Sequence, residues 1–90
     1  MTLCQFNFLE ATQQLELINK YAVPVTERKE GNYLYKLLHI DRFYIEEKWN
    51  ALLNKLVSYT SFNSEEKLLP YAPAIDLWQL KYMMYRSEPI

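Results

Sequence analysis

The sequence predicts an α+β fold, with an N-terminal helix, a four-stranded antiparallel meander and one or two short C-terminal helices. Apolar residues recur at helical spacing near the N-terminus, four runs rich in β-branched and aromatic residues follow, and helix-start patterns return near the C-terminus. Half of the 90 residues are hydrophobic, enough to form the core of one domain. We therefore expect residues 1–90 to form a single domain, with residues 76–90 as a helical tail.

The first expected helix covers residues 8–21. Asn7 is placed to accept a backbone N–H bond, and Glu10, three residues later, can close a capping box. The apolar stripe that follows consists of Ala11, Leu15, Ile18 and Ala22. Pro24 prevents the helix from continuing.

Four strand-like segments follow this helix. Residues 23–26 contain Pro24 and are predicted to form an edge strand, because proline cannot donate a hydrogen bond to a ladder. After a turn at residues 30–32, residues 33–40 and 43–49 are predicted to pair as a hairpin around Asp41 and Arg42. A loop at residues 50–54 then leads to a fourth strand over residues 56–62.

The hairpin has one chemically sensible register. It pairs Ile40 with Phe43, Leu38 with Ile45, Lys36 with Glu47 and Leu34 with Trp49. This register places large apolar residues on one face and sets Lys36 across from Glu47 on that same face. It also places His39 across from Tyr44 on the opposite face.

Two further helix starts are expected near the C-terminus. Residues 62–66 begin a short helix, which Pro70 and Pro73 interrupt. Asp76 can cap a last helix over residues 77–86.

The run from Tyr35 to Glu46, together with Phe62 and residues 69–71 and 75–76, resembles the central segment of short hypothetical proteins from gut bacteria of the Bacteroides group. The likeness spans residues 6–77. This chain has Arg42 where those proteins would have glycine, and it adds residues 78–90. No activity is assigned to that family, so the resemblance implies the fold and no particular chemistry.

Composition argues against several classes of protein. The formal net charge is −1 and the charges are mixed along the chain, so the basic face that a nucleic-acid binder needs is not expected. Cys4 is the only cysteine, which precludes an internal disulfide. The sequence shows neither a signal-peptide pattern nor an apolar run of about 20 residues. We expect a cytoplasmic protein without membrane contact.

The residue types that carry catalysis are scarce. His39 is the only histidine, and one histidine with one cysteine cannot complete a typical metal site. Gly31 is the only glycine, whereas phosphate-binding loops need several. Glu46 and Glu47 are adjacent in a strand and must point to opposite faces. We expect no catalytic residue, cofactor or metal, and hence no enzyme.

The tyrosines are the most informative feature. They form either an ordinary inner layer covered by a helix or a wet aromatic surface that binds a partner. The last helix is apolar on nearly all sides, which favours burial against a second copy. The residues predicted to contact a partner are Tyr33, Tyr35, His39, Tyr44, Trp78, Tyr82 and Tyr85.

The leading function is therefore a protein–protein interaction module that forms a homodimer. One alternative is a small-molecule binder with a pocket between the aromatic face and the last helix. The third is an enzyme that uses His39 with Glu46. Deleting residues 77–90 is expected to reduce assembly while leaving the sheet folded.

Overall fold

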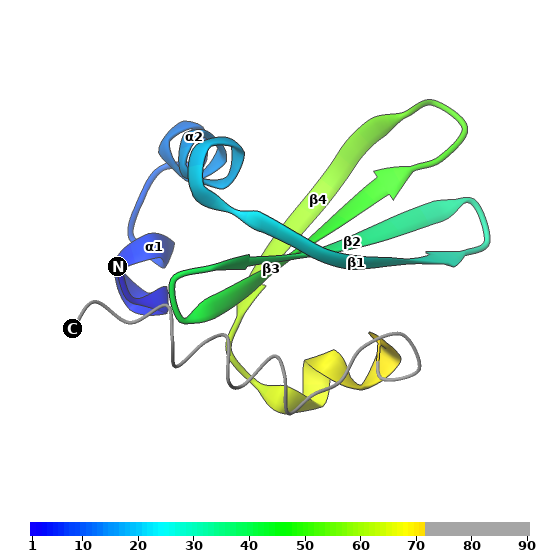
Figure 1. Ribbon diagram of the computed structural model, residues 1–90. Coiled ribbons are helices and arrows are strands. Elements are labelled where there is room, and N and C mark those ends of the chain that lie inside the picture. Colours follow the sequence, from blue (N-terminus) through cyan, green and yellow to red (C-terminus); the bar gives the residue numbers. More distant parts are fainter. Residues whose placement is uncertain (72–90) are drawn as a thin grey trace.

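The structure is a computed structural model that describes residues 1–71 of the chain. Two helices, α1 (Leu3–Asn7) and α2 (Ala11–Tyr21), precede a four-stranded antiparallel sheet, and a 3-10 helix, η1 (Glu65–Tyr71), follows it (Figure 1). The predicted α+β fold class is confirmed. The expected helix over residues 77–86, with Trp78, Tyr82 and Tyr85, lies outside the described residues.

The predicted N-terminal helix is present as α2, but it begins at Ala11 instead of residue 8, and a second short helix, α1, precedes it. Thr2 caps α1, because its hydroxyl accepts the N–H of Gln5 at 3.1 Å while the Gln5 side chain accepts the N–H of Thr2 at 2.8 Å. The backbone N–H of Glu10 donates to the Gln13 side chain at the start of α2. Asn7 therefore ends a helix instead of capping one.

The break between the helices allows Phe6 to enter the core. Phe6 is fully buried, and its ring centroid lies 5.2 Å from that of Phe43 on the sheet. Gln14 of α2 donates to the carbonyl of Phe6 at 2.9 Å, which holds the two helices together. A continuous helix would need residues 8–10 in helical geometry, yet Glu10 is extended.

The strands are β1 (Val23–Glu30), β2 (Tyr33–Ile40), β3 (Phe43–Asn50) and β4 (Lys55–Phe62), and they lie side by side in chain order. All four predicted β2–β3 pairs are present, from Ile40 with Phe43 to Leu34 with Trp49. β1 is an edge strand as predicted, although it is twice the expected length. Asp41 adopts a φ of 49° in the β2–β3 turn, a conformation that aspartate tolerates better than most residues.

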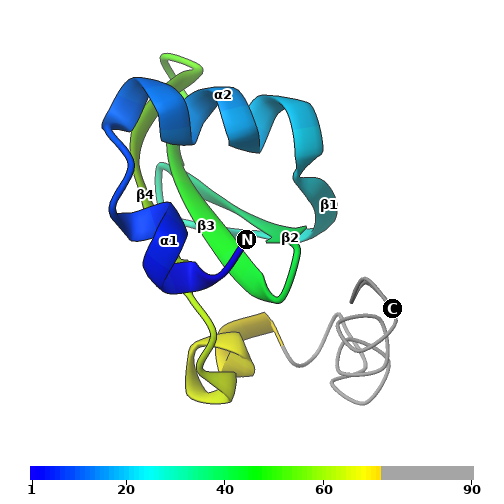
Figure 2. The ribbon, with the colours of Figure 1, turned by 90° about the vertical axis from the view of Figure 1, so that its left-hand side faces the viewer.

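Each face of the sheet carries its own buried cluster. On the face covered by α1 and α2 (Figure 2), the cluster consists of Phe6, Ile18, Leu38, Ile40, Phe43 and Ile45. The opposite face, which we call the second face, is covered in part by η1. Its buried cluster consists of Leu37, Tyr44, Phe62, Leu68 and Tyr71.

Candidate functional site

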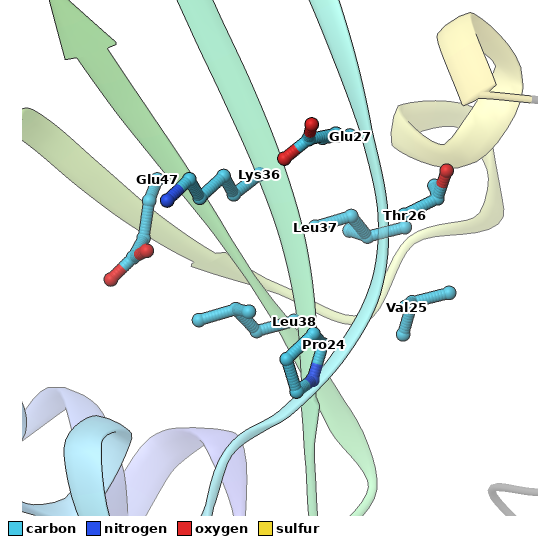
Figure 3. A pocket seen from close by; sticks show the side chains of 8 residues that line it. All are labelled: Pro24, Val25, Thr26, Glu27, Lys36, Leu37, Leu38 and Glu47. Carbon is cyan, nitrogen blue, oxygen red and sulfur yellow. The ribbon is translucent and has the colours of Figure 1, made fainter.

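A groove of about 510 Å³ lies beside β1, where a bulge between Pro24 and Thr26 interrupts pairing with β2 (Figure 3). Lys36, Leu38 and Glu47 lie on one side of β2, whereas Leu37 lies on the other. Thr26, which pairs with Leu37, also lies on that other side, so the polar groups do not converge on one point as they do in a small-molecule site. The groove is a feature of the sheet edge rather than a pocket for chemistry.

Lys36 and Glu47 are cross-strand neighbours as predicted, yet the structure assigns each a different partner. The Lys36 ammonium lies 4.6 Å from the ring centroid of Trp49. The indole N–H of Trp49 donates to Glu47 at 3.2 Å. Within residues 1–71, Trp49 therefore lies between the two charged groups, which form no direct ion pair with each other.

Cations and tyrosine rings alternate along the second face. The Lys48 ammonium lies 4.2 Å from the Tyr33 ring centroid and 6.0 Å from that of Tyr35. The Arg28 guanidinium follows at 4.1 Å from the Tyr35 centroid and 5.4 Å from the Tyr71 centroid. Each cation thus contacts two rings, which makes this row a brace across β1, β2 and β3.

Glu46 completes the brace. The Tyr71 hydroxyl donates to Glu46 at 2.7 Å, and an Arg28 nitrogen lies 3.9 Å from the same oxygen. Burial, followed by this bond to the Glu46 carboxylate, raises the pKa of Tyr71. The hydroxyl therefore stays protonated and continues to donate, which fixes the end of η1 to β3.

His39 and Tyr44 face each other as predicted, with ring centroids 5.7 Å apart. They are not exposed contact residues, however, since their exposed fractions are 7% and 1%. Phe62 stacks on Tyr44 with centroids 5.6 Å apart, and it belongs with Leu68 to the same buried cluster. Packing of η1 against the sheet therefore buries a part of this face that the sequence alone leaves open.

The other predicted contact residues differ in their accessibility. Tyr33 is 38% exposed and Tyr35 is half-buried beneath Arg28 and Lys48. Arg28 and Tyr71 are not among the contact residues that the sequence predicts. The local sequence around each residue cannot predict their contacts, because the hydrogen bond between Tyr71 and Glu46 joins residues 25 positions apart.

Within residues 1–71, two buried polar atoms of the His39–Tyr44 pair lack a hydrogen-bond partner: Nε2 of His39 and the hydroxyl oxygen of Tyr44. No hydrogen bond within residues 1–71 links His39 to Glu46, so the imidazole–carboxylate pair of an acid–base enzyme is not assembled there. In the same range, no three His, Cys, Asp or Glu side chains gather as a metal site requires. None of the described helices combines the length and apolar character needed to cross a bilayer.

Replacing Tyr44 with phenylalanine is expected to raise the free energy of unfolding by about 1 kcal/mol, because it removes a buried hydroxyl that has no partner among residues 1–71. Burial raises the pKa of Tyr44 to about 12, with a further contribution from Glu65. The folded state thus favours the neutral phenol, and this stability is lost as pH rises from 10 toward 12. Urea denaturation of both proteins at pH 7 and pH 11 tests both points. A lower free energy of unfolding in Tyr44→Phe at pH 7 would contradict the first. An equal loss of stability from pH 7 to pH 11 in the wild type and in Tyr44→Phe would contradict the second.

His39 is expected to destabilise the protein in mild acid. Burial lowers the pKa of His39, against the opposing effect of a hydrogen bond with the Asp41 backbone and the Asp41 charge. The unfolded chain therefore takes up this proton first, and stability falls as pH drops below about 6.5. Thermal melts of the wild type and His39→Gln between pH 7.5 and 5 measure the effect, which a parallel fall in both proteins would contradict.

Large apolar side chains are exposed along β4. Leu52 and Leu53 in the β3–β4 turn are 78% and 65% exposed, and Val57 on the strand is 53% exposed. Phe8 is 86% exposed and directly follows Asn7, whose side chain accepts a hydrogen bond from Ser61 of β4. We call these four residues, Phe8, Leu52, Leu53 and Val57, the β4 rim.

Comparisons of the chain with protein-family models, with curated proteins and with solved structures found no match. A function for this protein is therefore inferred from the geometry of residues 1–71.

Proposed function

We propose that this protein is a small non-enzymatic module that acts through contact with protein chains and assembles as a homodimer. The observation that supports the proposal is the β4 rim, in which four large apolar side chains on β4, in the turn before it and near its C-terminal end are between 53% and 86% exposed. Exposed large apolar side chains that a partner can cover are typical of interaction sites. Association would bury them.

The polar side chains of the second face support a non-catalytic role. Tyr71 and Arg28 engage Glu46, and the same arginine forms an ion pair with Glu30 at 2.6 Å. His39 is buried with its pKa lowered, which favours the neutral imidazole. These groups brace the sheet and are not arranged around a reacting atom.

Light scattering across a concentration series tests the proposal. We expect the full chain to approach twice its mass of 10.9 kDa at high micromolar concentration. Replacing Phe8 and Val57 together with serine should shift the transition to higher concentration, because it removes two exposed apolar side chains of the rim. Leu69→Ser is the matched control, since Leu69 is 60% exposed on η1, outside the rim. A mass of 10.9 kDa at every concentration would overturn self-association.

A small molecule bound at the second face is the second candidate. The unpaired atoms of His39 and Tyr44 favour it, because buried polar atoms in folded proteins are nearly always hydrogen-bonded. Native mass spectrometry of the freshly purified protein tests it. A co-purifying molecule that disappears in His39→Phe supports this function, and a chain that carries none argues against it.

A further inference from the structure

We infer that the homodimer forms by antiparallel pairing of β4 with β4 of a second copy, about a two-fold axis at Thr60. The inference rests on the proposed self-association and specifies its interface. Such pairing would join the two four-stranded sheets into one continuous sheet of eight strands.

The two edges of the sheet differ in how they discourage pairing. β1 carries Pro24, a bulge and the charged run Glu27 to Glu30, all of which are features that protect sheet edges. β4 has neither proline nor charge from Leu56 to Phe62. Within residues 1–71, no strand pairs with its outer side (Figure 1).

The register of the sheet identifies which backbone groups face outward. The Ala51 N–H donates to the Asn32 carbonyl at 2.9 Å, so the odd-numbered residues of β3 are hydrogen-bonded to β2 and the even-numbered ones face β4. Even-numbered residues of β3 pair with Ser58, Thr60 and Phe62. The backbone N–H and C=O groups of Tyr59 and Ser61 therefore point away from the sheet, toward the free edge.

One antiparallel register uses all of these groups within the regular part of β4. A bulge interrupts the strand before Ser58, which leaves residues 58–62 as the regular segment. Pairing Tyr59 of each copy with Ser61 of the other gives two hydrogen-bonded pairs, each with two bonds. Thr60 then lies opposite Thr60 of the second copy, a cross-strand combination that is favourable in sheets.

Charge supports this direction of pairing. Lys55 precedes the uncharged segment, and Glu65 and Glu66 follow it. Antiparallel pairing brings the lysine end of each strand toward the acidic end of the other copy. The exposed Phe8 directly follows Asn7, which bonds Ser61, and it lies near Asn63 at the end of β4, where a second copy would approach it.

Cysteine cross-linking tests the register. Cys4 is the only cysteine and is exposed, so the background variant is Cys4→Ser. Thr60→Cys in that background should form an intermolecular disulfide under oxidised glutathione, because directly opposed residues of a non-hydrogen-bonded pair lie about 4.5 Å apart at Cα. Thr60 is exposed, so the change is compatible with the folded monomer.

Ser58→Cys is the matched control. Ser58 is exposed on the same strand and the same face, but the register sets it opposite Phe62 of the second copy. Its two copies would then lie four residues apart, about 13 Å, beyond the reach of a disulfide. Cross-linking at position 60 and not at position 58 is the expected result. Equal cross-linking at both positions would overturn the register.

A second pair of variants tests the edge in solution. Ser61→Pro removes an outward N–H while leaving the ladder with β3 intact, and we expect it to weaken dimerisation at least tenfold. Ser61→Ala loses only the hydroxyl bond to Asn7 and should dimerise like the wild type. If the Ser61→Pro variant dimerises as well as the wild type and Thr60→Cys forms no cross-link, this interface is overturned while self-association still stands. A wild-type chain that stays monomeric overturns both.

Discussion

Replacing Tyr71 with alanine is expected to lower the free energy of unfolding by about 3–5 kcal/mol, the range for deleting a buried aromatic ring. Tyr71 is 1% exposed, its hydroxyl donates to Glu46 and its ring lies beside the Arg28 guanidinium. The substitution leaves a cavity and removes one of the two buried side chains that attach η1 to the sheet. Small domains have a total stability of about 5–15 kcal/mol, so the variant should be close to unfolding.

Tyr71→Phe is the matched control for this variant. It keeps the ring and loses only the hydrogen bond to Glu46. The expected loss in the free energy of unfolding is about 1.5 kcal/mol, because the acceptor is charged but water can still reach it in part. Urea denaturation followed by tryptophan fluorescence measures both variants. If Tyr71→Ala costs no more than Tyr71→Phe, the ring does not hold η1 in place.

Replacing Phe43 with alanine is expected to destabilise the protein by a similar amount, about 3–5 kcal/mol, through the other face of the sheet. Phe43 is 1% exposed and packs against Phe6 of α1. Phe8→Ala is the control, because Phe8 is 86% exposed and its loss should change the free energy of unfolding by no more than about 0.5 kcal/mol.

A double-mutant cycle with Phe6→Ala separates contact from bulk burial. We expect the two rings to couple by about 0.5–1.5 kcal/mol beyond the sum of their burial. Additive effects would show that Phe6 and Phe43 contribute independently. Circular dichroism in urea at low protein concentration is the appropriate measurement, since it limits any contribution from self-association.

The β2–β3 hairpin could be predicted from the sequence residue by residue. Side chains alternate between the two faces of a strand, so slipping the register by one residue would expose Leu38 and Ile45 and bury charges instead. The same alternation places Glu46 and Glu47 on opposite faces: Glu46 accepts from Tyr71, whereas Glu47 accepts from Trp49. The alternation of apolar residues along neighbouring strands is therefore sufficient to predict the register where one face of the hairpin must be buried.

The N-terminal helices show where local pattern falls short. Asn7 and Glu10 fit a capping box, as do Thr2 with Gln5 and Glu10 with Gln13. Each of these boxes is worth about 1 kcal/mol, so caps alone cannot select among them. Burial of Phe6 against the sheet is worth more, about 1.5–3 kcal/mol, and it favours the two-helix arrangement.

The sequence by itself determined the α+β class, the order of the strands and the register of the central hairpin, because these follow from alternation, turn chemistry and proline. Only the tertiary structure decided that His39 and Tyr44 are buried and that Tyr71 reaches Glu46 across 25 positions of chain. It also decided that apolar side chains remain exposed along β4. Burial of a sheet face depends on which distant segment packs there, and no local periodicity encodes that contact.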